Sequence, residues 1–312
     1  MDPFVPTDLY APIVSGLRAA SEKRAAREGQ SKKHVSIEPA VFWICQIPNL
    51  SFKDDMASME AAIFTLETKK DLQVGRWKSK DGKRSMVVTP SFYGRATMFD
   101  KDLLIYLISN SVALVNRGEI PSRTIRFTAH HFLKSIGKVP NSNHHRRMRP
   151  MMNRLLGTMI ETDIATGGRI ITEAFGLIDS WRMVSDERKD SADRLVIEVT
   201  LSEWTYRAVL AKEVLTINPA YFNLRKALER RLYEIARKHV GKQTSWDIGL
   251  ETLRSKCGST IQRLRQFRAE VSKIAVADTL PDYRVDVISD TKVRFITRDT
   301  SRILKNLAKA TL

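Results

Sequence analysis

The order of segments near the C-terminus constrains the fold more than any other feature of this chain. Residues 225–241 and 245–258 both carry a helical pattern, and a third helix is predicted over residues 259–276, after a tight turn. Residues 283–299 have the pattern of a β-hairpin, with a turn at Ser289-Asp290 that its aspartate favours. Helix, helix, turn, helix and hairpin is the order of a winged-helix domain.

A similar order comes earlier in the chain. Asp100 and Thr128 are placed to cap its first two helices. The expected segments are paired strands in 87–99, a helix over 100–115, a strand over 124–127, helices over 129–138 and 144–160, and β-rich runs over 169–184 and 194–201. The sequence therefore predicts an α+β fold with two tandem winged-helix domains.

The chain is expected to divide into four parts. Residues 1–38 form a flexible basic tail, since the run from Arg18 to Lys33 holds six basic and two acidic residues and almost no large apolar side chain. Residues 39–211 form the first winged-helix domain, expected to dimerise and to contact the DNA backbone. Residues 212–300 form the second, expected to recognise specific DNA, and residues 301–312 form a C-terminal tail.

The net charge favours a polyanionic partner. Fifty-two Lys and Arg against 35 Asp and Glu leave a formal charge of +17, whose self-repulsion a nucleic acid would relieve. An anionic membrane surface and a merely solvated basic surface are the alternatives. No run of apolar residues is long enough to span a membrane and the first residues lack a secretory pattern, so a cytoplasmic protein is expected. Cys45 and Cys257 are too far apart to suggest a zinc site.

The predicted third helix of the second unit has one apolar and one polar side. The apolar side consists of Ile261, Leu264, Phe267, Val271 and Ile274. The opposite side carries Gln262, Arg265, Gln266, Ala269 and Lys273, with Arg263 and Arg268 on its flanks. Arginine can bond guanine, glutamine can bond adenine, and a small apolar side chain can touch a thymine methyl group. The sequence thus predicts a helix in the major groove, and a solvated basic face is the alternative.

Two further sets of side chains are expected to contact DNA. The hairpin supplies Lys292, Arg294 and Arg298 for the phosphates. In the first unit, the apolar stripe Met148, Met152, Leu155, Leu156 and Met159 leaves Asn143, Arg146, Arg147, Asn153 and Arg154 facing away from it. Pro150 requires that this helix either begins near Arg149 or bends, so contacts to phosphates are expected there rather than contacts to bases.

Motifs for bond chemistry are missing from the sequence. The histidine pairs His130-His131 and His144-His145 are adjacent, which differs from the His-x-His of metal-dependent nicking enzymes, and no phosphate-binding GxxxxGK[ST] loop is present. The acidic pairs Asp54-Asp55 and Asp186-Glu187 are expected in solvated loops. We therefore predict that the chain is not an enzyme and holds no cofactor and no metal.

Four segments carry a family resemblance. Residues 59–70, 92–109, 160–181 and 217–241, the last including Asn-Pro-Ala-Tyr-Phe and Leu-Glu-Arg-Arg-Leu-Tyr, resemble the replication initiator protein A family of plasmids from α-proteobacteria. The resemblance covers roughly residues 59–300. It implies tandem winged-helix domains that bind direct repeats (iterons) in double-stranded DNA at a plasmid origin. It also implies opening of an adjacent AT-rich duplex, contacts with the host initiator and replicative helicase, and homodimers that repress the initiator's own gene.

Two other classes of function remain as alternatives. A winged-helix transcriptional regulator or autorepressor is compatible with the same fold, because a fold does not by itself determine function. An origin-nicking or priming enzyme is disfavoured by the missing metal-binding and nucleotide-binding motifs.

Overall fold

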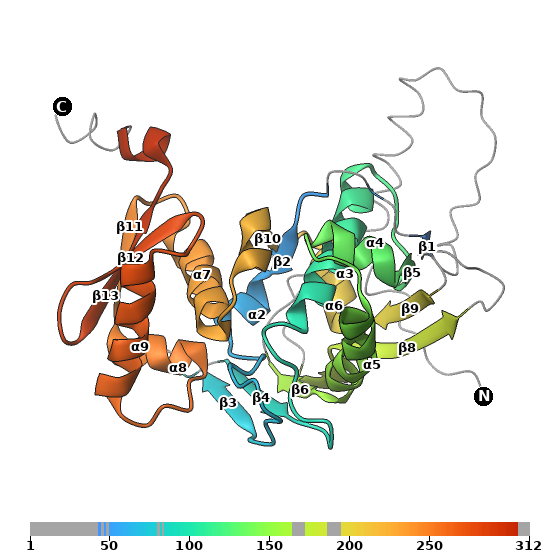
Figure 1. Ribbon diagram of the computed structural model, residues 1–312, viewed down its shortest axis with the longest axis horizontal. Helices are drawn as coiled ribbons and strands as arrows, with labels where there is room; N and C mark the ends of the chain where they lie inside the picture. The colour runs from blue at the N-terminus through green and yellow to red at the C-terminus, as the bar shows by residue number, and fades with distance from the viewer. Residues whose placement is uncertain are drawn as a thin grey trace.

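The computed structural model describes residues 43–44, 47, 50–79, 82, 84–163, 172–185 and 195–304 (Figure 1). The predicted N-terminal tail 1–38, Asp186-Glu187, Cys45 and residues 305–312 of the predicted C-terminal tail lie outside these residues. Within the described part of the chain, no helix combines the length and the apolar character needed to cross a bilayer.

From residue 101 onward the first unit has the predicted helices and strands, but the paired strands expected over 87–99 are wrong, because β4 ends at Thr89 and residues 90–99 form no named strand. Its four-stranded sheet has the order β1-β5-β9-β8, in which β1 is parallel to β5 and the other pairs are antiparallel. The elements are β1 (Trp43–Ile44), α3 (Lys101–Asn116), β5 (Thr124–Thr128), α4 (Ala129–Ser135), α5 (Ser142–Gly157), β8 (Ile178–Ser185) and β9 (Leu195–Leu201). Thr128 caps α4 as expected, since its hydroxyl accepts from the N–H of His131 at 3.1 Å.

Helix α5 differs from the prediction in its start and in its buried face. It begins at Ser142 and continues through Pro150, so the first of the two alternatives, a start near Arg149, is wrong. Pro150 is exposed, and water can therefore bond the backbone carbonyl that loses its helical donor. The buried stripe of α5 includes Met151, which was not predicted, and lacks Leu156 and Met159, which were. Met159 is not part of the helix, because α5 ends at Gly157 and Met159 begins the following strand.

The second unit is organised around a three-stranded antiparallel sheet of order β11-β13-β12. Its elements are α7 (Ala227–Val240), β11 (Ser245–Gly249), α8 (Leu250–Cys257), α9 (Leu264–Ala277), β12 (Tyr283–Val287) and β13 (Lys292–Thr297). Residues 245–249 were expected to begin a helix but form a strand, because Trp246 and Ile248 pair with Phe295 and Val293 of β13.

A further four-stranded sheet and several short elements connect the two units. The antiparallel sheet β3-β4-β6-β7 lies along the lower edge of Figure 1, between them. Its strands are β3 (Gly75–Lys78), β4 (Ser85–Thr89), β6 (Met159–Thr162) and β7 (Glu173–Gly176). The short elements are β2 (Lys53–Asp55), α2 (Met56–Glu60), α6 (Glu203–Leu210), β10 (Val214–Thr216) and η2 (Pro219–Asn223). The predicted run 169–184 is thus divided between two sheets, since β7 pairs with β6 and β8 pairs with β9.

A buried group of charges joins the two units where α7 packs against α2 and α3. Lys101 on α3 is completely buried, with its Nζ 2.7 Å from Asp54 Oδ2 and 3.0 Å from Glu234 Oε2 on α7. Arg231 lies 3.2 Å from Glu234 and donates to the carbonyl of Ser58 at 2.8 Å. The expectation of a solvated loop at Asp54-Asp55 is therefore wrong, because both carboxylates are buried at this joint.

Burial and charge act in opposite directions on this group. Burial raises the pKa of Asp54 well above its ordinary value, although the Lys101 ammonium opposes the shift. Burial alone would lower the pKa of Lys101, but the Asp54 and Glu234 carboxylates raise it above its ordinary value. The buried charge of Lys101 on α3 is therefore compensated by carboxylates from two other segments, β2 and α7.

Candidate nucleic-acid interface

Helix α9 presents the polar side that its sequence pattern predicts. Phe267, Val271 and Ile274 are buried, and Ile261 and Leu264 are partly buried against the same core. On the opposite side, four of the predicted DNA-contacting residues are exposed: Arg265, Gln266, Ala269 and Lys273. The predicted orientation of this helix is therefore confirmed by burial. The fifth predicted residue, Gln262, and the flanking Arg263 are exposed but precede the first turn of α9.

The segment that leads into α9 is held by side chains that the sequence pattern did not single out. Gly258 ends α8 in the left-handed conformation, with φ of +63°, as its position suggests. Arg254 on α8 donates to the carbonyls of Ile261, at 3.1 Å, and Gln262. The expected helix over 259–263 is absent because these carbonyls are bonded to Arg254 rather than to the next turn. Their extended backbone places Arg263 at the helix N-terminus.

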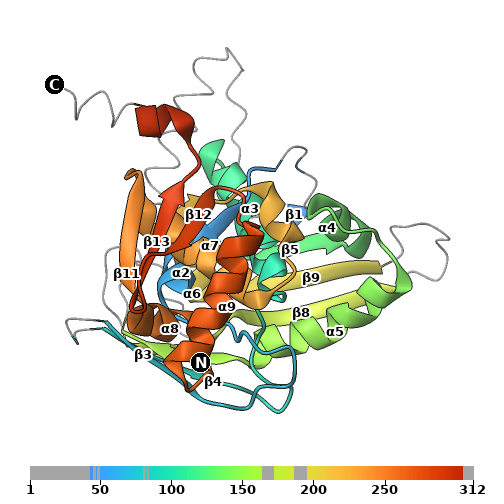
Figure 2. The same cartoon turned by 60° about the vertical axis from the view of Figure 1, so that its left-hand side comes forward.

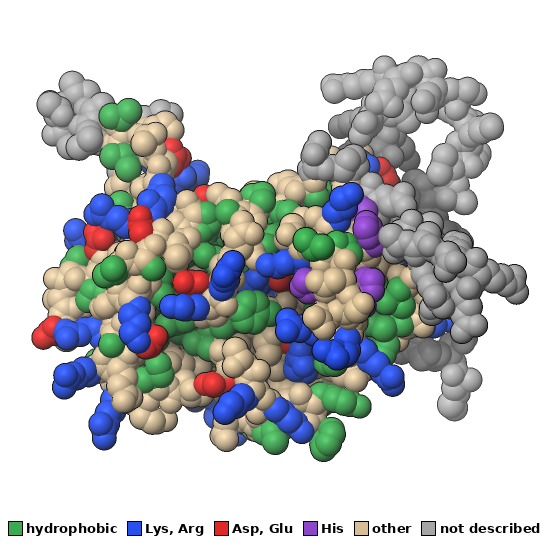
Figure 3. Space-filling model, viewed as in Figure 1, with side chains coloured by type: hydrophobic (Ala, Val, Ile, Leu, Met, Phe, Trp, Pro, Cys, Tyr) green, Lys and Arg blue, Asp and Glu red, His purple; other side chains and the backbone are tan. Residues whose placement is uncertain are grey.

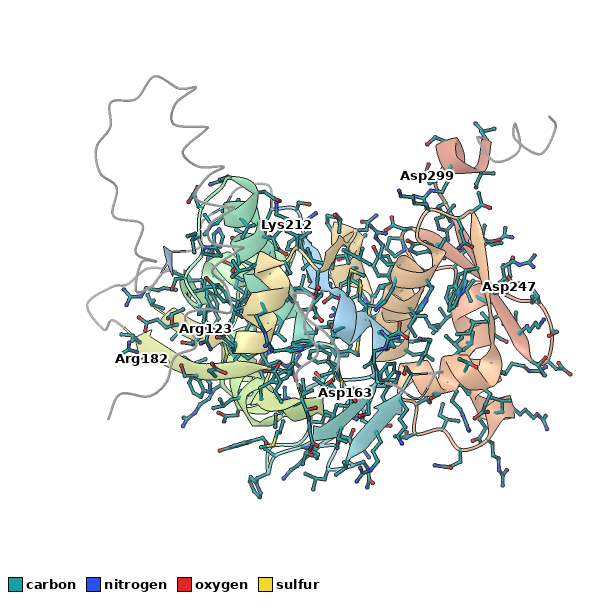
Figure 4. The ribbon with its side chains drawn as sticks, turned by 180° about the vertical axis from the view of Figure 1, so that it is seen from behind. Arg123, Asp163, Arg182, Lys212, Asp247 and Asp299 are labelled. Atoms are coloured by element: carbon teal, nitrogen blue, oxygen red, sulfur yellow. The ribbon has the colours of Figure 1, made fainter. Side chains whose placement is uncertain are left out.

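Of the three hairpin cations predicted to contact DNA, two are paired with carboxylates and one has no such partner among the described residues. The guanidinium of Arg294 bonds both carboxylate oxygens of Asp247, at 2.6 and 2.7 Å, on the strand that Figure 4 shows at the outer side of this unit. Arg298 pairs with Asp278 beyond the end of α9. The side chain of Lys292 is exposed and has no hydrogen bond or ion pair with any residue that the structure describes. Of the predicted hairpin contacts, Lys292 is therefore the one most available to a phosphate.

Two cations of α9 also have acidic neighbours. Arg268 pairs with Asp290 in the hairpin turn, and Lys273 lies 2.6 Å from Glu270 on its own helix. Such exposed pairs contribute little to stability, so a phosphate can replace the carboxylate at small cost.

Helix α5 begins with a cap and an exposed basic turn. The side chain of Asn141 accepts from the N–H of His144 at 2.9 Å, which fixes the N-terminus of the helix. Asn143, Arg146 and Arg147 are exposed, as predicted, and Asn153 is half-buried.

Arg154 has a structural partner. Its guanidinium donates to both oxygens of Asp100, at 2.7 Å each, and hydrogen bonding to this carboxylate raises the pKa of Arg154. The prediction that Asp100 caps α3 with its side chain is wrong, because the carboxylate bonds Arg154 and the N–H of Thr97. Arg154 therefore joins α5 to the start of α3.

A cationic cleft lies beside α5. It has a volume of about 780 Å³ and is bounded by α4, α5, residues 68–70 and residues 93–102, with Leu224 and Arg225 at the side of the second unit. Its basic lining includes Lys69, Lys70, Lys138, Arg147 and Arg225. Of these, only Arg147 was predicted. The others come from segments with no shared pattern, so the sequence carries no signal that they lie together.

The two polar helices face the same way. Figures 1 and 2 both show α9 and α5 on the near side of the molecule, and Figure 3 shows Lys and Arg side chains gathered over both of them. A duplex laid across this side would meet basic side chains from both units.

One histidine of each pair makes an internal contact. Nδ1 of His131 lies 2.7 Å from the hydroxyl of Tyr106, and Nδ1 of His144 lies 2.8 Å from the carbonyl of Val139. Among the described residues, no group of three or more His, Cys, Asp and Glu is arranged to hold a metal ion.

Comparisons with known proteins point to one process. A family model described as "Replication initiator protein A" matches residues 53–285. A "Putative replication protein" of Wigglesworthia glossinidia brevipalpis is 35% identical over 237 residues, which cover 75% of this chain and 84% of the relative. Two crystal structures of domains 2 and 3 of RctB, one a selenomethionine derivative, match with TM-scores of 0.53. They are 12% identical and cover 78% of this chain and 97% and 96% of theirs.

These matches define a replication initiator with a mixed α and β fold. The chain belongs to the replication initiator protein A family, whose model spans both units described above. The likeness to RctB, at 12% identity, bears on the fold alone.

Proposed function

We propose that this chain starts plasmid replication by binding repeated duplex sites at an origin through two winged-helix domains. The order helix, strand, helix, helix and two strands occurs in both units, although in the first unit β6 and β7 come between α5 and the two strands. In each sheet the last strand, β9 or β13, lies between the first strand and the other strand of the pair. This is the order of a winged-helix domain, in which the third helix enters the major groove. In this chain the third helices are α5 and α9.

The observation that carries the proposal is the two-sided character of α9. Its apolar side is buried against the hairpin sheet, so the helix cannot turn its other side inward. That other side presents a guanidinium, a carboxamide and a methyl group, from Arg265, Gln266 and Ala269. These are the groups that bond guanine, bond adenine and contact the thymine methyl. Specific recognition of the repeat is therefore assigned to α9.

The other basic groups act on the phosphates. Arg146 and Arg147 on α5 and Lys292 in the hairpin are exposed and carry no base-specific arrangement. Such contacts fix the register of a protein on the duplex and supply most of its salt-dependent affinity. The first unit thus orients the molecule on DNA and offers a surface for a second copy.

Origin opening follows from binding and bending in this proposal. Bending one site costs on the order of 1–6 kcal/mol, and adjacent copies bound to tandem repeats can together supply the strain that separates an AT-rich duplex. The chain performs no bond chemistry itself. The host initiator and replicative helicase act on the opened strands.

A footprint of the purified protein on the DNA that flanks its gene tests the proposal. Protection of several tandem sites beside an AT-rich stretch is the expected result. Protection of a single palindrome over a promoter would favour a transcriptional regulator, and nicking of supercoiled plasmid in Mg²⁺ would refute the absence of catalysis.

Substitutions then test the assignment of α9. Arg265→Ala should weaken binding to the specific site by about 1–3 kcal/mol and leave binding to unrelated DNA nearly unchanged. Lys292→Ala should weaken binding to both kinds of DNA in about equal proportion. Arg182→Ala is the matched control, since it removes one charge from β8, far from α9 in Figure 4. Equal losses of specific and non-specific binding in Arg265→Ala would contradict the orientation of α9.

A further inference from the structure

Two neighbouring aromatic rings are exposed to solvent on the two central residues of the turn that follows β4. Phe92 is 81% exposed and Tyr93 is 52% exposed, and their ring centroids lie 5.8 Å apart. Exposed adjacent aromatic rings are unusual on a soluble protein, because each would gain free energy by leaving water. Their exposure therefore needs an explanation outside the packing of this chain.

The turn that carries the rings is firmly held. Ser91 accepts two hydrogen bonds within the turn. Its carbonyl accepts from the N–H of Gly94 at 2.9 Å, and its side-chain hydroxyl accepts from the N–H of Tyr93 at 3.2 Å. Gly94 has φ of +88°, and a side chain there would lie 3.0 Å from Lys70. The next residue, Arg95, is buried and forms an ion pair of 2.9 Å with Asp71. The rings are thus presented by a fixed backbone.

Positive charge surrounds the rings. Nζ of Lys70 lies 3.9 Å from the centroid of the Phe92 ring, a cation–π contact. Tyr93 lines the cationic cleft together with Lys69, Lys70 and Arg147. The carboxylates that line this cleft, those of Asp100 and Asp102, are already paired with arginines, and so is the carboxylate of Asp71. The partner of the rings is therefore expected to be both aromatic and anionic.

We propose that Phe92 and Tyr93 form a stacking site for the unpaired bases of single-stranded DNA, with the phosphates held by Lys69, Lys70 and Arg147. A base within a duplex already has both faces stacked, whereas an unpaired base exposes a face to an aromatic ring. Aromatic platforms beside a basic groove bind single strands with little dependence on sequence. This inference rests on the proposed function, because the opened origin supplies the single strand.

Fluorescence polarisation with labelled dT20 and with a labelled duplex repeat separates the two proposals. The double substitution Phe92→Ala/Tyr93→Ala should weaken binding of dT20 by about tenfold or more. Binding of the duplex repeat should change by less than about twofold, since α9 and α5 are unaltered. Phe92→Trp should keep the affinity for dT20, because its ring also stacks. Leu72→Ala is the matched control, as it removes a 55% exposed apolar side chain from the neighbouring segment without removing a ring.

Each contrary outcome has a separate meaning. If the unaltered chain binds the duplex repeat but not dT20, the stacking site is refuted while the proposed function survives. If it binds neither, the proposed function fails first. If Phe92→Leu binds dT20 as tightly as the unaltered chain, the contact is apolar rather than aromatic, and the rings would instead serve a protein partner. Unchanged urea midpoints in the variants ensure that a loss of binding is not a loss of folding.

Discussion

Replacement of Lys101 by methionine tests how strongly the two units are joined. The substitution preserves most of the volume of the side chain and removes its charge from a completely buried position. Asp54 would then lose its charged partner, whereas Glu234 would keep Arg231 at 3.2 Å and the hydroxyl of Tyr221 at 2.7 Å. Among the residues that the structure describes, the Asp54 carboxylate would retain only the N–H of Asp55 as a hydrogen-bond donor, at 3.0 Å.

The expected cost follows from this loss. Removing one partner from a buried ion pair typically costs about 3–5 kcal/mol, because the remaining charge is left without compensation. The free energy of unfolding of an ordinary domain is only about 5–15 kcal/mol, so Lys101→Met should leave the folded chain only marginally stable. The double variant Lys101→Met/Asp54→Asn should recover much of the loss, since an amide has no charge to compensate.

Urea unfolding at several values of pH measures the effect. Burial raises the pKa of Asp54 in the folded chain, and loss of Lys101 removes an interaction that lowers it. A carboxyl group with a raised folded pKa destabilises the fold at high pH and ceases to do so as the pH falls and it becomes protonated. The cost of Lys101→Met should therefore be greatest at neutral pH and shrink toward pH 4. A cost under about 1 kcal/mol at pH 7, or one independent of pH, would refute this account of the joint.

Three further substitutions or reactions have definite expected results. Arg154→Ala should destabilise the chain by about 2 kcal/mol in urea, because the Asp100 carboxylate loses its two hydrogen bonds from Arg154. It should change the affinity for the duplex repeat by less than about twofold. A larger effect on affinity than on stability would restore Arg154 as a DNA contact. Burial raises the pKa of Cys257 to about 12. In a Cys45→Ser variant, the Cys257 thiol should therefore react with a disulfide reagent at pH 8 only when the chain unfolds. Rapid labelling of the folded chain would contradict the burial of Cys257. Gly258→Ala should lower the free energy of unfolding by at least about 1 kcal/mol in the same urea assay. The reason is that φ of Gly258 is +63° and the added carbon would lie 2.6 Å from the β-carbon of Ala62. An unchanged urea midpoint would show that the turn can shift to make room for the added carbon.

The parts of the fold that the sequence predicted are those determined by local pattern. The apolar spacing Phe267, Val271 and Ile274 defines the buried side of α9, and the structure confirms it. The caps and stops at Thr128 and Gly258 act within a few residues of their own position, so their roles follow from residue type. These features do not depend on distant partners.

The features that escaped prediction depend on contacts between distant residues. Strand β11 is five residues long and is defined by its pairing with β13, which lies 47 residues further along the chain. Lys101 and Asp54 are likewise 47 residues apart, and Arg230 pairs with Asp102 across 128 residues. From the sequence alone, basic residues within a helical pattern, such as Lys101 and Arg230, are expected on the exposed side of the helix, because their distant acidic partners are not known. For the same reason, the cleft beside α5 could not be assembled from its separate segments.

The buried charges at the joint also alter what a polyanion meets at the surface. Among the described residues, eight acidic and five basic side chains are buried. Burial thus removes more acidic than basic side chains from the surface, so the accessible surface is more basic than the formal charge of +17 implies. Because salt screens charges over about 10 Å, the outermost groups dominate the electrostatic potential at contact. The positive potential that DNA meets at contact is therefore partly a product of folding, and an unfolded chain of the same composition would lack this surplus.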